Sequence, residues 1–250
     1  MRGISETVKH LIIINALMFI GTLAIGNGEL FYKWFALYFP KNELFQPWQV
    51  ITHMFMHGNF MHILFNMFAL WMFGTAVEQQ LGSKKFLFIY ISAGLGAMLF
   101  QLGFYYFNFL PIYSELVNSG LNEYEIIKML TSNKAIEGIS QVQFSQLQQL
   151  YPIYNASMVG ASGCIMGILA AFGMMNPNAK LMMIFLPIPI KAKYFIPGII
   201  ILDLISAFSG QSFFSPSNTA YMAHVGGALT GFIIMWIWKK NQFDKYRWDK

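Results

Sequence analysis

The chain alternates between long apolar stretches and shorter polar segments. A helix that crosses a membrane needs about 20 apolar residues, with about 17 as the lower end. Six stretches reach or approach this length, and they cover residues 11–26, 60–77, 86–107, 158–175, 194–208 and 219–238. The fourth and fifth are short and need their flanking residues to span. This pattern predicts an all-α membrane protein, in which residues 1–250 form one domain built as a bundle of six transmembrane helices.

The segment between the first two stretches, residues 29–60, has a different character. It is rich in aromatic side chains, including Trp34 and Trp48, and carries only a few charges. Tryptophan and tyrosine concentrate at the boundary between membrane and water. We therefore expect this first loop to lie in the interface and not to cross the bilayer.

Composition supports a membrane location and excludes several other classes. Hydrophobic residues make up 56% of the chain and charged residues 11%, whereas roughly a quarter of the residues of a soluble domain are charged. The single cysteine, Cys164, provides neither a disulfide framework nor a thiolate metal cluster. The net charge of +5 does not indicate nucleic-acid binding, because the basic residues are spread over the loops and are not clustered with aromatic residues.

The distribution of these basic residues predicts the orientation of the chain. Of its 16 lysine and arginine residues, all but Lys33, Lys41, Lys128 and Lys134 fall on one side of the six-span arrangement. Lysine and arginine accumulate in cytoplasmic loops. We therefore expect a multi-pass protein with cytoplasmic N- and C-termini, in a bacterial cytoplasmic (inner) membrane.

A polar insertion, residues 108–157, separates the third and fourth stretches and faces outward in this orientation. It contains four of the 11 acidic residues of the chain, more than any other loop. Residues 122–130 and 144–150 have the spacing of short helices with one apolar face. The pattern indicates a soluble or interfacial cap and assigns it no role.

Polar residues inside membrane spans are costly, and they are therefore candidates for a functional site. Ser162 begins the fourth stretch, between small neighbours, and His224 lies on the sixth. Small residues recur at every fourth position beside each of them: Gly163, Gly167 and Ala171 on one span, and Ala223, Gly227 and Gly231 on the other. Such stripes let two membrane helices approach closely. If the stripes face each other, the hydroxyl and the imidazole meet, and neutral His224 can remove the serine proton.

A serine that attacks a carbonyl group also needs donors for the oxyanion that forms. His62 and Asn66 are four residues apart on the second span, so both project from one face of it. The backbone N–H groups of Ser162 and Gly163, at the start of a helix, have no partner within that helix. Together these groups form a candidate oxyanion hole.

Each of these residues also has a structural interpretation. A serine in a membrane helix often bonds the carbonyl of the preceding turn, and His62 and Asn66 are equally suited to joining helices by hydrogen bonds. A zinc site at His53, His57 and His62 is a weaker alternative, because Gly58 and Asn59 interrupt the helix and no acidic or cysteine ligand lies nearby. We expect no metal, and His53 and His57 are expected to bond loop backbone.

Three motifs, in this order and on three spans, resemble the signature of the rhomboid intramembrane serine proteases. They are the run from His57 to Asn66 (HGNFMHILFN), the turn Gly160-Ala161-Ser162-Gly163, and the sequence AHVGG that contains His224. The resemblance covers nearly the whole chain except residues 108–157. It implies a six-span rhomboid-like bundle.

The resemblance also implies roles for individual residues. Ser162 would be the nucleophile, His224 the general base, and His62 and Asn66 would form the oxyanion hole with the amides of Ser162 and Gly163. No third, acidic member is expected, so Asp203 on the fifth span is expected to pack helices or to belong to the gate. Glu78, at the exit of the second span, is expected to anchor the fold.

Two departures from the family pattern concern residues beside the site. Many members have Trp-Arg in the first loop, whereas this chain has Trp48-Gln49, so the loop must be anchored differently. Some members have an aromatic residue four positions after the serine, where this chain has Met166. Neither change removes a reacting group.

The resulting hypothesis is a serine endopeptidase that cleaves single-span membrane proteins near the outer face of the lipid bilayer, without a cofactor. The fifth span and residues 209–221, which include Phe213 and Phe214, are the expected gate and lid for the substrate. A catalytically inactive relative that binds transmembrane clients is the alternative. A transporter is a further one, but the chain lacks the internal repeat that it predicts. Oligomeric state does not follow from the sequence.

Overall fold

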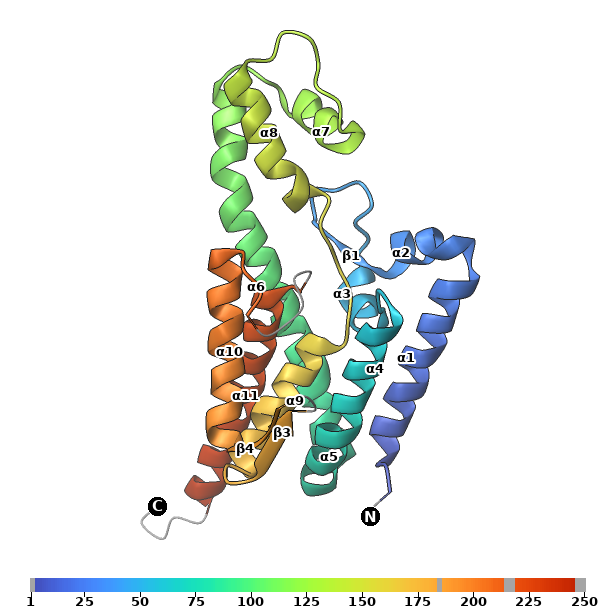
Figure 1. Ribbon diagram of the computed structural model, residues 1–250, viewed down its shortest axis with the longest axis vertical. Coiled ribbons are helices and arrows are strands. Elements are labelled where there is room, and N and C mark those ends of the chain that lie inside the picture. The colour runs from blue at the N-terminus through green and yellow to red at the C-terminus, as the bar shows by residue number, and fades with distance from the viewer. Residues whose placement is uncertain (1–2, 184–185, 214–218, 246–250) are drawn as a thin grey trace.

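The computed structural model describes residues 3–183, 186–213 and 219–245 of the chain. They form a helical bundle with two small antiparallel sheets (Figure 1). The helices are α1 (Glu6–Ala24), α2 (Glu29–Phe35), α3 (Gln49–Thr52), α4 (Phe60–Ala69), α5 (Thr75–Leu81), α6 (Ser83–Asn118), α7 (Glu123–Ser132), α8 (Gln141–Tyr154), α9 (Ser162–Met175), α10 (Ala192–Ser209) and α11 (Tyr221–Lys245). The strands are β1 (Leu37–Tyr38), β2 (Ser157–Met158), β3 (Lys180–Met183) and β4 (Leu186–Lys191).

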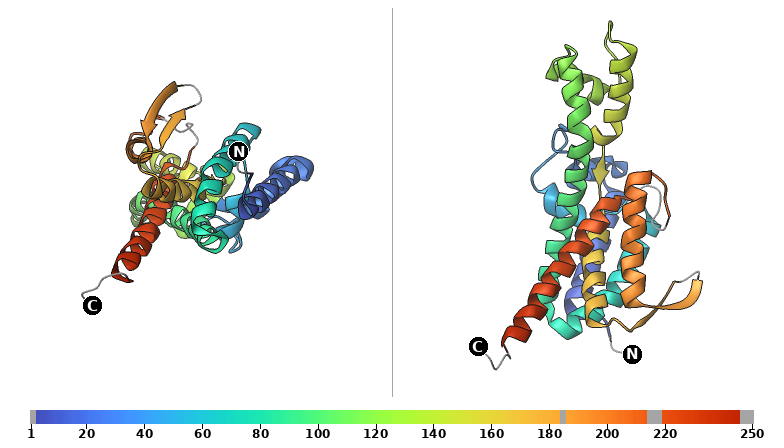
Figure 2. Two further views of the ribbon diagram at one scale, coloured as in Figure 1. Left: turned by 90° about the horizontal axis from the view of Figure 1, so that it is seen from below. Right: turned by 90° about the vertical axis from the view of Figure 1, so that its left-hand side faces the viewer.

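Five helical segments in the described part of the chain are long and apolar enough to cross a membrane. They are α1, the continuous segment Phe60–Leu81 that joins α4 to α5, α6, α10 and α11. The apolar α9 is shorter, at 14 residues, and lies among them. The hairpin of β3 and β4 projects sideways from the end of the bundle that lies away from α7 and α8 (Figure 2).

Two of the expected span limits differ from the structure. The third span does not end at residue 107, because α6 continues to Asn118 and its outer part carries apolar residues that pack against α7 and α8. The fourth does not begin at residue 158, because Ser157 and Met158 are extended and pair with β1. Gly160 has a φ of +125°, which ends the extended segment before α9 starts at Ser162.

Backbone-to-backbone contact joins α9 to α11, as the two small-residue stripes predict. A Cβ atom on Gly227 would lie 3.2 Å from the Cα of Gly163, and one on Gly231 would lie 2.6 Å from the Cα of Gly167. Nothing larger than glycine fits at this distance. The two stripes therefore face each other, and the helices that carry Ser162 and His224 are in register.

A third helix, α6, joins this contact and was not expected in it. A Cβ atom on Gly163 would lie 2.5 Å from the Cβ of Ala97, and one on Gly226 would lie 2.7 Å from the carbonyl oxygen of Gly96. The three helices thus meet along small residues, and Figure 2 shows α11 crossing the long α6. We call this contact of α6, α9 and α11 the glycine seam.

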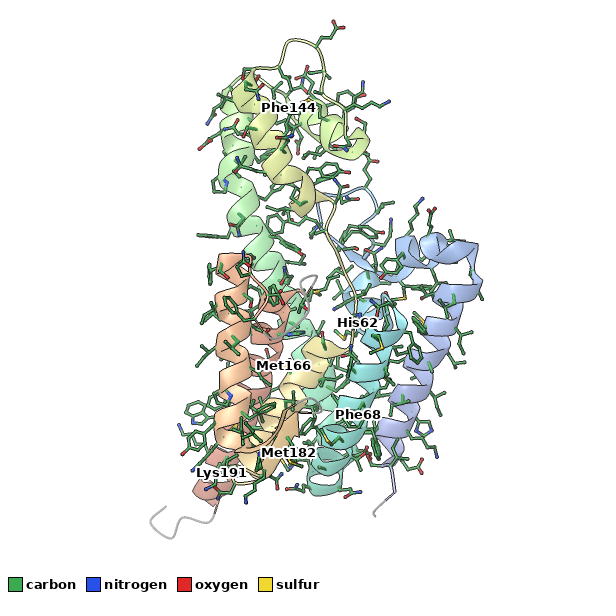
Figure 3. The ribbon with its side chains drawn as sticks, viewed as in Figure 1. His62, Phe68, Phe144, Met166, Met182 and Lys191 are labelled. Carbon is green, nitrogen blue, oxygen red and sulfur yellow. The ribbon has the colours of Figure 1, made fainter. Side chains whose placement is uncertain are left out.

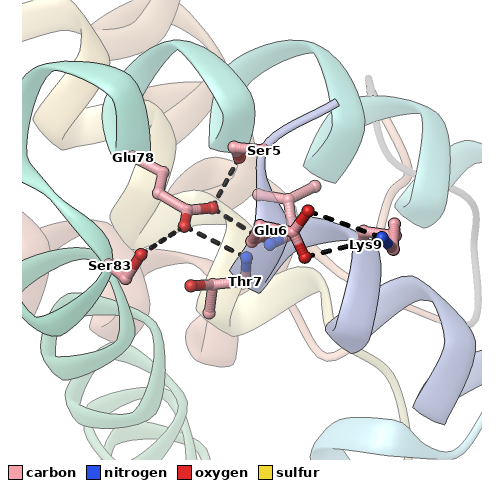
Figure 4. A network of polar contacts seen from close by, with 7 residues as sticks. Ser5, Glu6, Thr7, Lys9, Glu78 and Ser83 are labelled. Atoms are coloured by element: carbon pink, nitrogen blue, oxygen red, sulfur yellow. Dashed lines mark hydrogen bonds and ion pairs between the residues drawn. The ribbon is translucent and has the colours of Figure 1, made fainter. Parts of the chain in front are cut away.

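Glu78 anchors the start of α1 to the second span, as expected. Its carboxylate accepts hydrogen bonds from the backbone N–H groups of Thr7 (3.0 Å) and Val8 (3.1 Å), and from the hydroxyls of Ser5 (2.5 Å) and Ser83 (2.7 Å) (Figure 4). The first N–H groups of a helix have no partner within it and favour a nearby negative charge. Glu78 therefore caps α1 from another helix.

The first loop is held by the amide of Gln49, which is fully buried. Its oxygen accepts hydrogen bonds from the backbone N–H groups of Gln46 (3.0 Å) and Tyr38 (3.4 Å). Its nitrogen donates to the carbonyl oxygens of Lys33 (3.0 Å) and Leu44 (2.9 Å). A neutral amide thus ties three parts of the loop together.

The insertion forms a helical cap, which we define as the outer part of α6 together with α7 and α8. It has its own apolar core, which includes Leu116, Ile126 and Leu150 and reaches Phe39 of the first loop. Lys41 in the first loop contacts Glu123 at 3.4 Å. The cap lies at the end of the bundle opposite the start of α1 and the end of α11 (Figure 1).

Because α9 and α11 touch along the glycine seam, we expect a methyl group added to one of its glycines to push the two helices apart. We expect Gly227→Ala to lower the free energy of unfolding by about 1–3 kcal/mol, because the added carbon meets the backbone of Gly163. Thermal unfolding in detergent measures this loss. Gly198→Ala on α10 is the matched control, since nothing lies within 4 Å of its added Cβ, and it should leave stability unchanged or raise it by about 0.5–1 kcal/mol. Equal effects of both substitutions would contradict the packing argument.

Candidate active site

Ser162 is the first residue of α9, and the preceding turn fixes its position. The N–H group of Gly160 donates to the carbonyl oxygen of His53 at 3.0 Å, which ties the turn to the first loop. A Cβ atom on Gly160 would lie 2.8 Å from Nε2 of His62 and 3.7 Å from Oγ of Ser162. Only glycine therefore leaves room for the imidazole and the hydroxyl on the two sides of this turn.

His62 lies in the first turn of α4, at the end of that helix nearest the cap (Figure 3). The side chain of Asn59 caps the helix by accepting the N–H of His62 at 2.8 Å. The N–H of Gly58 points at Nδ1 of the His62 ring at 3.4 Å. Because Nδ1 accepts this hydrogen bond, the proton of the neutral ring lies on Nε2, the atom beside Gly160.

Asn66 lies one turn further along α4 and is largely buried. Its amide nitrogen donates to the carbonyl oxygen of His62 at 2.9 Å. An amide has two N–H donors, so this bond commits only one of them. Asn66 therefore shares a helix face with His62, as the spacing predicts, and one of its two donors is engaged within α4.

Backbone donors at the start of α9 complete this side of the site. The first hydrogen bond within α9 runs from the N–H of Ile165 to the carbonyl oxygen of Ala161, at 2.9 Å. The N–H groups of Ser162 and Gly163 precede it and have no partner within the helix. They are available to an oxyanion next to Ser162, in the positive end of the helix dipole.

His224 lies in the first turn of α11, and contacts with α6 and α9 fix this turn. The N–H of Ala223 donates to the side-chain oxygen of Gln101 on α6 at 3.2 Å. The carbonyl oxygen of Ala223 lies 3.7 Å from where a Cβ on Gly163 would be. The turns that carry His224 and Ser162 are thus neighbours. The sequence analysis missed Gln101, since a single polar residue in an apolar helix has no periodic signal.

The ring of His224 contacts a second residue that the sequence analysis did not place in the site. Its Nδ1 lies 2.7 Å from Oδ2 of Asp203 on α10. The Asp203 side chain is completely buried, and that of His224 is 12% exposed. Asp203 was expected to pack helices or to belong to the gate. Its carboxylate instead contacts the imidazole of the expected base.

His53 and His57 lie in the first loop and differ in their partners. Nδ1 of the buried His53 lies 2.8 Å from the carbonyl oxygen of Gln49, as expected of a residue that bonds loop backbone. His57 has a looser link to the backbone: its buried ring nitrogens have no partner of ordinary hydrogen-bond geometry among the described residues, and its backbone interaction is with Phe55. Its ring packs edge-on against that of His62, with centroids 5.0 Å apart. Among described residues, no three His, Cys, Asp or Glu side chains are grouped to hold a metal ion.

Burial keeps both loop histidines neutral. Loss of water lowers the pKa of His53 from 6.5 to about 4, and burial together with the nearby His62 lowers the pKa of His57 to about 3. In the unfolded chain both side chains take up a proton near pH 6.5. The unfolded state thus binds more protons below that pH, so folding loses stability as the pH falls from 6.5 towards these lower values.

We therefore expect the unfolding temperature of the native chain to fall between pH 6.5 and pH 4. His57→Leu should reduce this fall, because it removes a group that is neutral only in the folded state and whose ring nitrogens have no partner of ordinary hydrogen-bond geometry in the described part. Thermal unfolding in detergent at a series of pH values measures the difference. The exposed His10, replaced by leucine, is the control and should leave the pH dependence unchanged. An identical pH dependence in the native chain and His57→Leu would refute this explanation.

The expected gate and lid are described only in part. Phe213 follows α10 and is 57% exposed, and its N–H donates to the hydroxyl of Ser206 at 3.4 Å. Phe214 lies outside the described residues. Met166, one turn after Ser162, is buried in the core of the bundle (Figure 3).

The site thus brings a serine, two histidines and several N–H donors to the end of α9 nearest the cap. Nε2 of His62 and Oγ of Ser162 border the same glycine. The seam places His224 on the adjoining turn. Such a set can activate a hydroxyl group and stabilise an oxyanion, which are the requirements of acyl transfer.

Comparison with known proteins agrees with this geometry. The Rhomboid domain matches residues 44–241, and this range includes every residue of the site. The chain is 24% identical over 228 residues to "Rhomboid protein 1, mitochondrial" of Saccharomyces cerevisiae, which covers 90% of this chain and 52% of the yeast protein. It is 28% identical over 231 residues to "Presenilin-associated rhomboid-like protein, mitochondrial" of Rattus norvegicus, which covers 90% of this chain and 47% of the rat protein.

A bacterial relative shares a shorter segment. The chain is 39% identical over 79 residues to "Rhomboid protease GlpG" of Salmonella newport, which is 32% of this chain and 28% of that protein. This chain spans about half the length of the yeast and rat proteins. Since both of these are mitochondrial, the comparisons do not support the expectation of a bacterial cytoplasmic membrane, although they support a multi-pass membrane protein. The Rhomboid domain matches most of this chain, and this match shows that the chain belongs to the rhomboid family.

Proposed function

We propose that this protein is an intramembrane serine endopeptidase, which hydrolyses peptide bonds in or near the transmembrane segments of single-span membrane proteins. The observation that carries the proposal is the position of Ser162 between Nε2 of His62 and the turn of His224, at the unpaired N-terminus of α9. One relative is named a rhomboid protease, which agrees with this chemistry. The proposed reaction needs no metal or organic cofactor.

The first half of the reaction transfers the acyl group to Ser162. Neutral His224 accepts the hydroxyl proton while Oγ attacks the carbonyl carbon of the substrate. The tetrahedral intermediate then collapses, the C–N bond breaks, and His224 gives the same proton to the leaving amine. An acyl-enzyme on Ser162 remains.

The second half releases the acyl group. His224 accepts a proton from water, whose oxygen attacks the ester carbon, and the proton returns to Oγ of Ser162 as the ester bond breaks. In both halves the oxyanion forms beside Ser162. Nε2 of His62, one N–H of Asn66 and the N–H groups of Ser162 and Gly163 are its proposed donors.

The shortness of α9 supports a reaction below the membrane surface. Its 14 residues span about 21 Å, whereas the apolar part of a bilayer is about 30 Å thick. If the inner end of α9 lies at the inner boundary, Ser162 lies some way below the outer one. Water must therefore reach Ser162 from the side of the cap, where the polar turns of the site lie.

The substrate must meet the site in an unwound form. The carbonyl groups of a membrane helix are bonded within that helix, so a segment has to open before Ser162 can attack. Small or helix-breaking residues in the substrate favour such opening. The proposed entrance lies beside α10 and the segment with Phe213, whose ring is largely exposed.

A client-binding protein without catalytic activity is the second candidate. Its supporting observation is that Asn66 donates to its own helix, so the oxyanion hole is incompletely open in this structure. The presence of both Ser162 and His224 favours the protease. The two candidates differ in whether any substrate is cut.

The dyad is tested with the full chain in proteoliposomes and a model single-span substrate. We expect cleavage by the native chain, and a fall in kcat of about 10⁴-fold or more in Ser162→Ala and His224→Ala, because each removes a reacting group. A fluorophosphonate probe should label Ser162. Undiminished cleavage in either variant would refute the dyad, and capture of varied substrates without any cleavage by the native chain would support the client-binding alternative.

The oxyanion hole predicts a smaller and separate effect. We expect His62→Ala to lower kcat by about 10²- to 10³-fold, since each donor to an oxyanion contributes about that factor. The exposed His10 on α1, replaced by alanine, is the matched control and should keep the native kcat. A native kcat in His62→Ala would exclude this residue from the oxyanion hole.

A further inference from the structure

A buried acidic side chain faces the proposed base from the neighbouring helix. Asp203 lies on the apolar helix α10, is completely buried, and has its Oδ2 2.7 Å from Nδ1 of His224. A carboxylate inside a membrane bundle is costly unless a partner compensates for the lost water. Three of the other buried residues on α10, Ala192, Ile196 and Ile199, are apolar. The contact with His224 therefore requires a chemical explanation.

The contact determines which ring nitrogen of His224 can act as a base. An ionised carboxylate only accepts hydrogen bonds, so Nδ1 must donate and must carry the proton of the neutral ring. The other nitrogen, Nε2, then keeps its lone pair. If the proton were on Nε2, the ring could not accept the proton of Ser162 through that atom.

We propose that Asp203 is a positioning residue that holds His224 in the orientation and tautomer in which Nε2 accepts the Ser162 proton. This rests on the proposed protease function and extends the dyad to a triad of Ser162, His224 and Asp203. The carboxylate also stabilises the imidazolium that forms when His224 takes the proton. Oδ2 of Asp203 lies 2.7 Å from Nδ1 of His224, and both side chains are largely shielded from water.

The surroundings of His224 leave this role to Asp203. His62 on α4 is near enough to interact electrostatically with His224, and a histidine cannot balance a positive charge. The contacts given for α6 and α9 with the first turns of α11 involve uncharged residues, among them Gln101 and Phe100. Within the described part of the chain, Asp203 is the acidic group that contacts the ring.

The position on α10 also links the base to the expected gate. One turn after Asp203, the hydroxyl of Ser206 donates to the carbonyl oxygen of Leu202 and accepts the N–H of Phe213. The same part of α10 thus holds both the carboxylate and the start of the lid segment. Displacement of this turn would remove the orienting contact from His224.

The first test uses isosteric and conservative substitutions in the full chain in proteoliposomes. We expect Asp203→Asn to lower kcat by about 10²- to 10⁴-fold with little change in KM, since the amide can hold the wrong tautomer. Asp203→Glu should restore part of the rate. His10→Ala, at an exposed position on α1 away from the site, is the control and should keep the native kcat. A change in KM alone, or a kcat within about threefold of native in Asp203→Asn, would overturn the proposal.

A second test separates positioning from a structural role. Because Asp203 acts through the imidazole, Asp203→Asn should cause no further loss in the His224→Ala background. A further loss there, comparable to that in the native background, would show a structural role and would overturn the proposal.

A third measurement is independent of folding defects and of proteolysis. The histidine-selective ¹⁵N spectrum of the native chain, with the signal of His224 assigned by comparison with His224→Ala, should show the neutral ring protonated at Nδ1. Protonation at Nε2 would overturn the proposal. If the native chain cleaves no substrate and the tautomer is nevertheless as expected, the proposed function fails and the positioning contact stands.

Discussion

The close backbone contact between α9 and α11 is the constraint on which the rest of the structure depends. A membrane provides little hydrophobic drive between helices, so association depends on tight packing and hydrogen bonds. Gly163, Gly167, Gly227 and Gly231 let these two backbones touch, and α6 closes on both. This contact fixes the relative height of the first turns of α9 and α11. Helix packing therefore sets the relative position of the serine and the histidine, and the turn at Gly160 adds a local constraint on Ser162.

Much of the fold follows from sequence patterns that act over short distances. Apolar length predicts the spans, the period of four predicts the facing stripes, and the apolar faces at residues 122–130 and 144–150 predict α7 and α8. These sequence patterns do not predict the other contacts between separate segments of the chain. Neither the two-residue pairing of β1 with β2 nor the extension of α6 into the cap has a periodic signal, because each depends on contacts with other segments of the chain.

The residues of the candidate site likewise fall into those that sequence patterns predict and those that they do not. His62 and Asn66 share a face of one helix, so their spacing predicts their proximity, and the family motifs predict Ser162 and His224. Asp203 was assigned to packing or to the gate, because 21 residues and a helix boundary separate it from His224 and no periodicity links them. His57 was expected to bond loop backbone, and its buried ring also packs edge-on against that of His62. Residues that act across helices need three-dimensional information.

The order of the helices along the chain has a consequence for biosynthesis. The first turn of α9 is made well before α11, and proteins of this size are synthesised and inserted from the N-terminus. Until α11 arrives, Ser162 lacks the imidazole of His224, and the glycines of α9 have α6 but not α11 to close on. Under the proposed function, a nascent chain in this state holds the proposed nucleophile without its proposed base. Proteolysis of neighbouring membrane proteins would then be withheld until α11 is in place.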